Sequence, residues 1–162
     1  MVKNIAPHGG KLINRIVSME ERELLLDKAT HYDMKKIQLN TREMSDLDMI
    51  AVGAMSPLEG FMRKADYDNV VDNMRLSNGL PWSIPIVILH LEEIFHHDKQ
   101  KESLEVYGVD DRKHPGVDYV FKMEEYLLGG KVSVVNRAKP SDFLSYRLDP
   151  AETREVFVKK GW

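Results

Sequence analysis

The chain has 162 residues, 43% of them hydrophobic and 30% charged, and a net charge of −3 at neutral pH. This length suits one globular domain, and this balance excludes a disordered chain and a membrane span, which needs ~20 consecutive apolar residues. The small negative charge gives no long-range attraction to nucleic acid or anionic lipid. Because cysteine is absent, disulfides, thiolate metal sites and cysteine nucleophiles are excluded.

Nothing in the sequence indicates export or a boundary between domains. Residues 1–11 lack the basic-then-apolar layout of a secretory signal, so the cytoplasm is the expected location. No internal repeat, low-complexity stretch or flexible linker interrupts the chain. We therefore expect residues 1–162 to form a single domain.

The first half of the chain predicts three helices and one short strand. Ser18 and Glu21 match a capping box, and Ser45 can cap a second helix that Gly53 would stop. Apolar residues at helical spacing follow Asp66 until a Ser-Asn-Gly turn. The expected ranges are helix 19–29, strand 36–39, helix 46–52 and helix 66–76.

The second half alternates strands and helices without the rhythm of a doubly wound sheet. A run of aliphatic and β-branched residues indicates a buried strand, and Asp149, Pro150 and Glu152 give the last helix a strong start. The expected ranges are strand 84–91, helix 98–106, a turn-rich loop 107–116, strand 131–136 and helix 150–160. This order favours an α+β fold with a small irregular barrel.

Three histidines, His90, His96 and His97, lie close together in the sequence with Asp98 beside them. Zinc binds imidazole and carboxylate groups, so the cluster raises a metal hypothesis. However, the neighbours His96 and His97 point to opposite sides of a strand, and the spacing indicates no fourth ligand. A solvated strand end is the simpler interpretation, and whether the cluster binds metal stays open.

Two Gly-Gly-Lys strings, at residues 9–11 and 129–131, pair flexible backbone with a cation as phosphate-binding loops do. Neither has the remaining positions of a Walker loop, so tight turns are the simpler interpretation. Three pairs of adjacent glutamates diverge on any regular backbone and are interpreted as solvated faces. Residues 110–116 are the best candidate for a functional loop, although a structural turn held by its own hydrogen bonds explains them as well.

A series of short strings in a fixed order is more specific than any of these motifs. The strings are Pro7–Gly10, Asp46–Ala51, Ser56–Met62, Met74–Gly79, Trp82–Ile86, Val106–Gly108, His114–Val117, Leu128–Gly130 and Glu152–Arg154. In this order they resemble the amino-terminal, PUA-like domain of ATP sulfurylase, also called sulfate adenylyltransferase, from one end of the chain to the other. The resemblance implies a PUA-like small mixed β-barrel with flanking helices.

The resemblance also implies an activity that belongs to another part of the enzyme. Members of this family join sulfate to ATP, forming adenosine 5′-phosphosulfate and pyrophosphate in sulfate assimilation or dissimilation, and they commonly assemble as homo-oligomers. Their catalytic nucleotidyltransferase domain follows a Gly-Trp like Gly161-Trp162 and carries Gln-Thr-x-Asn and His-x-x-His strings, which do not occur here. No catalytic, cofactor-binding or metal-binding residue is therefore assigned, no cofactor is expected, and the chain is expected to be inactive on its own.

The chain departs from the family between Trp82–Ile86 and Val106–Gly108, where family members carry a few dozen more residues that form additional strands. Here Ile84–Leu91 fuses two strands directly, which predicts a shortened or incomplete barrel. An exposed strand edge favours pairing with another chain, so we expect self-association as a dimer or a swapped assembly. Natural shortening, engineering and excision of a region all remain open as its origin.

Three functions remain open on the sequence alone. The first is a non-catalytic structural or docking domain that packs on a catalytic ATP-sulfurylase domain. The second is a PUA-like nucleic-acid-binding module, against which the charge and the 8% of aromatic residues argue, because RNA readers combine a basic face with exposed aromatics. The third is one half of a split ATP sulfurylase, with residues 8–11 and 110–116 as its contact surface.

Overall fold

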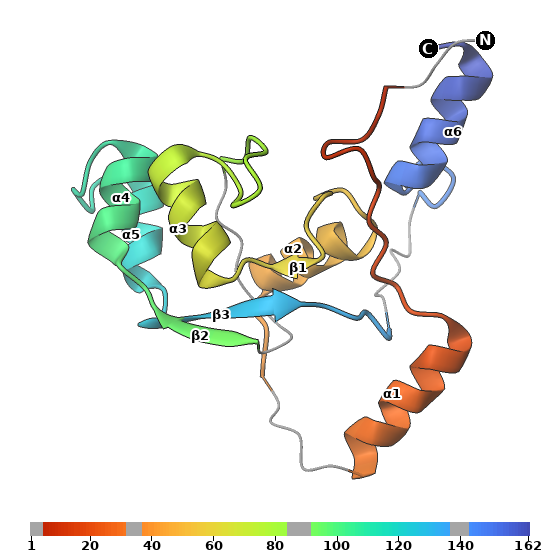
Figure 1. Cartoon of the computed structure of the whole chain (residues 1–162), viewed down its shortest axis with the longest axis horizontal. Helices are drawn as coiled ribbons and strands as arrows, with labels where there is room; N and C mark the ends of the chain where they lie inside the picture. The colour runs from red at the N-terminus through yellow and green to blue at the C-terminus, as the bar shows by residue number, and fades with distance from the viewer. Residues whose placement is uncertain (1–4, 32–36, 84–91, 137–142) are drawn as a thin grey trace. The chain divides into compact units, whose positions relative to one another are not determined.

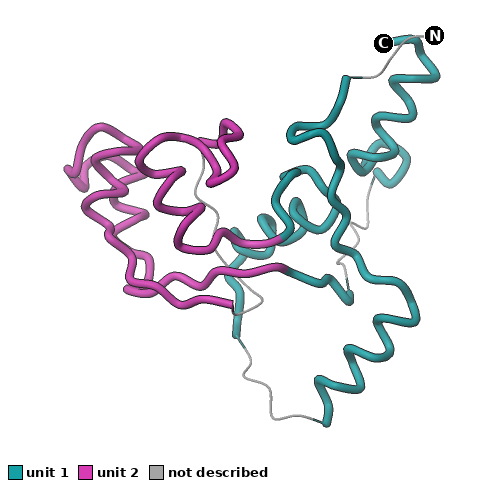
Figure 2. The backbone as a smooth tube through the Cα atoms, in the orientation of Figure 1, with its two compact units in different colours: residues 1–59, 132–162 teal, residues 60–131 magenta. Residues whose placement is uncertain are grey.

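The computed structural model describes residues 5–31, 37–83, 92–136 and 143–162, which form six helices and three strands (Figure 1). They divide into two compact units, residues 60–131 and residues 1–59 together with 132–162 (Figure 2). No helix in these described ranges is both long enough and apolar enough to cross a membrane. A single domain over residues 1–162 stays a prediction.

The unit of residues 60–131 is built on a three-stranded antiparallel sheet. β1 (Gly60–Phe61) and β2 (Glu93–His96) pair with opposite edges of β3 (Tyr126–Lys131), so β3 is the central strand. The expected mixture of helices and short strands is therefore confirmed. Within the described residues the sheet is open, and they do not form the barrel that the resemblance implied.

Glycines let β1 and β3 approach closely. Phe61 lies opposite Gly130 in the register, and a Cβ atom at Gly60 would overlap the carbonyl oxygen of Gly130. A Cβ atom at Gly129 would likewise overlap the carbonyl oxygen of Met62. The second Gly-Gly-Lys string is thus part of a strand, and the tight turn predicted there is wrong.

Three helices complete this unit: α3 (Lys64–Asn73), α4 (Lys99–Tyr107) and α5 (Pro115–Lys122). The Lys99 Nζ atom donates to the carbonyl oxygen of Phe121 at 3.3 Å and to that of Met123, which satisfies carbonyl groups at the end of α5. Burial of apolar side chains is the main source of stability here. The buried apolar residues of the unit are Phe61, Met62, Tyr67, Val70, Val71, Leu76, Phe95, Val117, Val120 and Leu127.

The other unit contains α1 (Met19–His31), α2 (Thr41–Ala51) and α6 (Pro150–Lys160). Arg15 connects segments that are distant in the sequence. Its N–H donates to the carbonyl oxygen of Ala51 at 2.9 Å, its guanidinium Nε to that of Val132 at 2.6 Å, and its carbonyl accepts from the N–H of Val134. The buried apolar residues of this unit are Ile50, Ala51, Val52, Leu58, Val132 and Val134.

The helices predicted at 19–29, 66–76, 98–106 and 150–160 are confirmed within a few residues at each end. The helix expected from residue 46 begins earlier, at Thr41. Its true cap is Asn40, whose side chain accepts from the N–H of Glu43 at 3.0 Å while Glu43 accepts from the N–H of Asn40 at 2.7 Å. Asn40 and Glu43 therefore form the capping box of α2, and Ser45, the expected cap, lies inside the helix.

Other element predictions are wrong or lie outside the described residues. Residues 37–39 form no strand, while Lys36 is outside the described ranges. The strand expected at 131–136 lies upstream, at Tyr126–Lys131, and downstream of it Val134 makes only an isolated bridge with Ile16. The strand expected at 84–91 is not described, and helix α5 begins inside what was expected to be a loop region.

Candidate functional site

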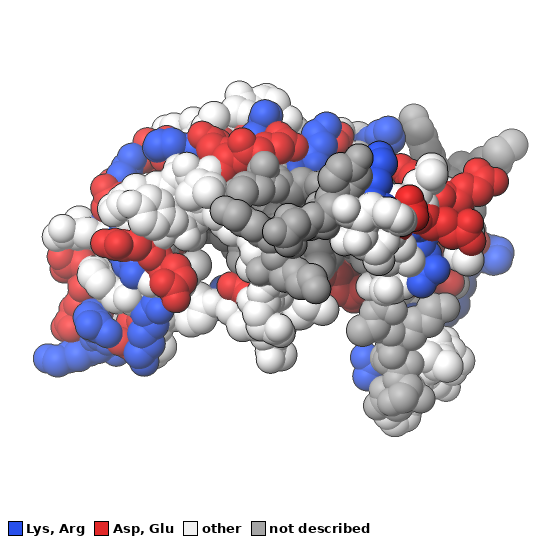
Figure 3. Space-filling model, turned by 90° about the horizontal axis from the view of Figure 1, so that it is seen from below, with Lys and Arg blue, Asp and Glu red and all other residues white. Residues whose placement is uncertain are grey.

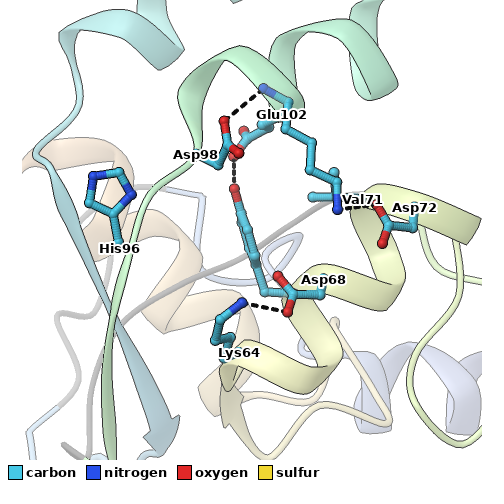
Figure 4. Close-up of a pocket in the computed structure, with 9 residues that line it drawn as sticks. Lys64, Asp68, Val71, Asp72, His96, Asp98 and Glu102 are labelled. Atoms are coloured by element: carbon cyan, nitrogen blue, oxygen red, sulfur yellow. Dashed lines mark hydrogen bonds and ion pairs between the residues drawn. The ribbon is translucent and has the colours of Figure 1, made fainter.

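A hollow of about 190 Å³ lies in the unit of residues 60–131 (Figure 4). Helix α3, strand β2 and helix α4 line it, because α3 and α4 pack together and β2 leads directly into α4. The lining residues are Lys64, Tyr67, Asp68, Val71, Asp72, His96, Asp98, Lys101 and Glu102.

The hollow is acidic. It has four carboxylates but only two lysines, and both lysines are already in ion pairs. Lys64 Nζ lies 2.6 Å from Asp68 Oδ2, and Lys101 Nζ lies 2.5 Å from Asp72 Oδ1. The lining therefore carries a net negative charge, which disfavours an anionic ligand such as sulfate or a nucleotide phosphate.

Two of the lining residues, Tyr67 and Glu102, belong to a buried hydrogen-bond network centred on Glu102. Its Oε2 atom accepts from the Tyr67 hydroxyl and lies 2.8 Å from Nε2 of His97. The His97 side chain is fully buried and that of Glu102 is 8% exposed. One carboxylate oxygen thus connects α3, the end of β2 and α4.

This network favours a neutral Tyr67. Burial, followed by the charge of Glu102, raises the pKa of Tyr67 far above its usual value. The Nδ1 atom of His97 has no hydrogen-bond partner among the described residues, so the contact with Glu102 determines how this imidazole is held. The arrangement suits a structural connection, because the polar atoms face one another rather than a substrate.

The histidine cluster divides in the structure. His96 is exposed and lies apart from the carboxylates in Figure 4, with its ring against Tyr126 at 5.9 Å between centroids. His97 is buried against Glu102. The prediction that His96 and His97 point to opposite sides is therefore confirmed. The prediction of a solvated strand end is wrong for His97. His90 is outside the described ranges. No group of three or more possible metal ligands occurs among the residues that the structure describes.

The loops proposed as candidates are held by their own hydrogen bonds. The N–H of Gly10 donates to the carbonyl oxygen of Pro7 at 2.8 Å, which confirms a tight turn at the first Gly-Gly-Lys string. In residues 110–116, the N–H of His114 donates to the carbonyl oxygen of Asp111 at 3.0 Å, and Nδ1 of His114 accepts from the N–H of Gly116 at 3.2 Å. The turn held by its own hydrogen bonds is therefore confirmed, and a functional role of this loop stays a prediction.

The arginine of that loop is also engaged. Arg112 Nη2 lies 3.1 Å from Asp118 Oδ1, while Lys122 Nζ lies 2.5 Å from Asp118 Oδ2. The hydrogen bond from Lys122, together with that from Arg112, holds the pKa of Asp118 below its usual value. Arg112 thus helps to hold the start of α5.

One pair of adjacent glutamates has a structural role that its spacing did not indicate. Glu93 Oε2 accepts from the N–H of Lys64 at 2.8 Å, at the start of α3. Glu92 Oε1 accepts from the N–H of Lys131 at 3.2 Å and Oε2 lies 3.6 Å from Arg63. Both carboxylates therefore hold strand and helix ends instead of forming a purely solvated face.

Charged side chains of both signs are interspersed on the face drawn in Figure 3. Blue lysine and arginine side chains there have red aspartate and glutamate side chains beside them, and neither sign covers a broad area. A phosphate backbone would be attracted by a basic stripe, and the described residues drawn in Figure 3 show none.

A family model described as a PUA-like domain matches the chain in two segments, residues 5–89 and 87–137. The two segments meet at residues 87–89, inside the stretch where the sequence predicted a loss of strands. The match ends at residue 137, so the segment that contains α6 lies beyond it.

Sulfate adenylyltransferases are similar to the chain over nearly its whole length. The one from Halothermothrix orenii is 46% identical over 98% of this chain and 48% of its own length, and the one from Acaryochloris marina is 40% identical over 98% and 47%. The chain thus spans about half the length of these relatives. The first alignment runs over 187 positions, more than the 162 residues present, so the relative has additional residues within the matched region.

Among solved structures, a hexameric APS kinase from Thiobacillus denitrificans is similar in fold. The TM-score is 0.72 and the sequence identity 26%, over 98% of this chain and 32% of that one. The similarity therefore includes residues of both compact units as well as the segment beyond residue 137.

Proposed function

Because the chain belongs to the PUA-like domain family and matches sulfate adenylyltransferases over 98% of its length, we propose that it is a non-catalytic structural domain of such an enzyme. In this proposal it docks on the part that holds the reacting groups and contributes none of them itself. Cytoplasmic location stays a prediction from the sequence.

The acidic hollow is the observation that carries this proposal. Joining sulfate to ATP with release of pyrophosphate concentrates negative charge on several oxygens, which positioned cations and hydrogen-bond donors must stabilise. The hollow offers four carboxylates, and its two lysines are already paired with Asp68 and Asp72. A site of this charge would repel both substrates.

Self-association is part of the proposal. The APS kinase from Thiobacillus denitrificans, to which the chain is similar over 98% of its length, is hexameric. Within the described residues the three-stranded sheet is open and ends in edge strands, which are a common place for pairing between chains. We expect a dimer or a swapped assembly, measured by sedimentation equilibrium.

The test measures pyrophosphate release from ATP and sulfate by the purified 162-residue protein. We expect none above a mock purification, and release that depends on a residue of this chain would refute the non-catalytic role. A second arm adds the half of the Halothermothrix orenii enzyme that the chain does not match. Release that appears only on mixing would identify the chain as one half of a split enzyme.

A third arm addresses the nucleic-acid alternative. A labelled RNA is titrated with the protein at low salt, where counterion release makes electrostatic binding strongest. Salt-dependent binding would support a nucleic-acid-binding module, and its absence is the result that we expect from the interspersed charges in Figure 3.

A further inference from the structure

Helix α6 has strongly specified ends. Glu152 accepts from the N–H of Asp149 at 2.7 Å, and Pro150 occupies the first turn. At the other end Gly161 adopts a left-handed φ of 74°, and the N–H of Trp162 donates to the carbonyl oxygen of Phe157 at 2.9 Å. This hydrogen bond is typical of a Schellman motif, which often brings two apolar side chains together at the end of a helix. Here they are the rings of Phe157 and Trp162, whose centroids are 5.9 Å apart.

The same helix has no buried residue in its 11 positions. An isolated helix shorter than ~12–15 residues is marginal in water, because most helical stability in proteins comes from packing an apolar face. Its ends are therefore those of a stable helix, whereas the residues that the structure describes bury none of its side chains. A partner that covers the helix would supply this packing.

Exposed apolar side chains gather in the same stretch, residues 143–162, which we name the C-terminal apolar segment. Phe157, Val158 and Trp162 are 40%, 49% and 68% exposed. Phe143 and Tyr146, upstream of the helix, are 72% and 83% exposed. Phe143, Tyr146, Phe157 and Trp162 are aromatic, and an aromatic side chain buries ~150–250 Å². Covering the exposed fractions of these four side chains would therefore remove on the order of 500 Å² from water.

The comparisons indicate what covers this segment. The PUA-like match ends at residue 137, whereas similarity to sulfate adenylyltransferases extends over 98% of the chain. The C-terminal apolar segment is therefore shared with those enzymes without belonging to the PUA-like match. The matched region is 48% of the Halothermothrix orenii relative, so about half of that enzyme is left as a possible partner.

We propose that the C-terminal apolar segment is the docking surface for the half of a sulfate adenylyltransferase that this chain does not match, with Phe157, Val158 and Trp162 at its centre. The proposal rests on the proposed function, since it names the surface through which the structural role is exercised. Covering Phe157 and Trp162 supplies the apolar contact that α6 lacks.

The test mixes the 162-residue protein with the unmatched half of the Halothermothrix orenii enzyme, produced separately and required to have a cooperative thermal transition. Titration calorimetry measures the Kd for the unaltered protein and for Phe157→Asp. We expect binding at least about tenfold weaker in the variant, a loss of 1.4 kcal/mol. The control is Leu104→Asp, which alters an apolar helix residue that is 45% exposed in the other unit, and its Kd should stay within about twofold.

Hydrogen exchange of the unaltered protein gives a second readout that does not depend on a variant. Amides of residues 150–160 should exchange rapidly in the isolated protein and slow down when the partner is added. Val158→Asp repeats the binding test at a neighbouring position, in case Phe157→Asp disturbs the helix end.

The outcomes separate this proposal from the proposed function. Binding that is unchanged in both variants, without slower exchange at 150–160, overturns the docking surface but leaves the structural role intact. Failure of the unaltered protein to bind overturns both. Self-association without the partner that Phe157→Asp abolishes means that a second copy covers the segment, which also overturns the proposal.

Discussion

Removing the hydroxyl of Tyr67 tests whether the buried network stabilises the unit of residues 60–131. In Tyr67→Phe, the Oε2 atom of Glu102 loses one of its two contacts and keeps only the one with His97 at 2.8 Å. Counted as whole residues, Tyr67 is 5% exposed and Glu102 is 7% exposed, so water has little access to replace the lost donor.

A hydrogen bond to a charged group contributes ~1.5–3 kcal/mol, and we expect Tyr67→Phe to lower the free energy of unfolding by about 2 kcal/mol. That corresponds to roughly a 30-fold increase in the unfolded fraction. Glu102→Gln should cost more, because it removes the negative charge that both donors face. The double variant should cost less than the sum of the two single variants, since they share one interaction.

The assay is urea denaturation followed by circular dichroism, with the midpoint and slope determined for each variant. Tyr126→Phe is the matched control, because it removes the same hydroxyl from a residue that is 58% exposed, and it should change the free energy by less than about 0.5 kcal/mol. If Tyr67→Phe is no more destabilising than Tyr126→Phe, the network does not stabilise the fold.

Two further predictions concern pH and strand packing. Burial and then the charge of Glu102 raise the pKa of Tyr67. The stability that this raised pKa gives is fully present below about pH 10 and is lost as the pH rises above it. Urea midpoints measured across this range should fall less steeply with pH in Tyr67→Phe than in the unaltered protein, and equal slopes would contradict the assignment. Gly129→Ala should lower the free energy of unfolding by about 2 kcal/mol, because its Cβ atom would overlap the Met62 carbonyl oxygen. Gly10→Ala should cost only about 1 kcal/mol, because Gly10 has open space around it and only its φ of +83° is unfavourable for alanine. Equal urea midpoints for these two variants would refute the close approach of the strands.

The sequence by itself determined most helices and the family. Helix ends depend on local chemistry, such as Asp98 at the start of α4 or Gly161 at the end of α6, and residues a few positions apart are enough to reveal it. The ordered strings from Pro7 to Arg154 likewise indicated sulfate adenylyltransferase, and the similarity over 98% of the chain confirms this resemblance.

Only the tertiary structure decided which polar residues are buried and where strands pair. Tyr67 and Glu102 are 35 positions apart, so no local pattern predicts that they share a hydrogen bond, or that His97 is buried while His96 is exposed. The glycines at 129 and 130 predict a turn when only their neighbours in the sequence are considered. In the structure they lie in a strand, and they allow Met62 and Gly60, from another part of the chain, to approach closely. Contacts between distant segments depend on how the elements pack, and this physical information is absent from short stretches of sequence.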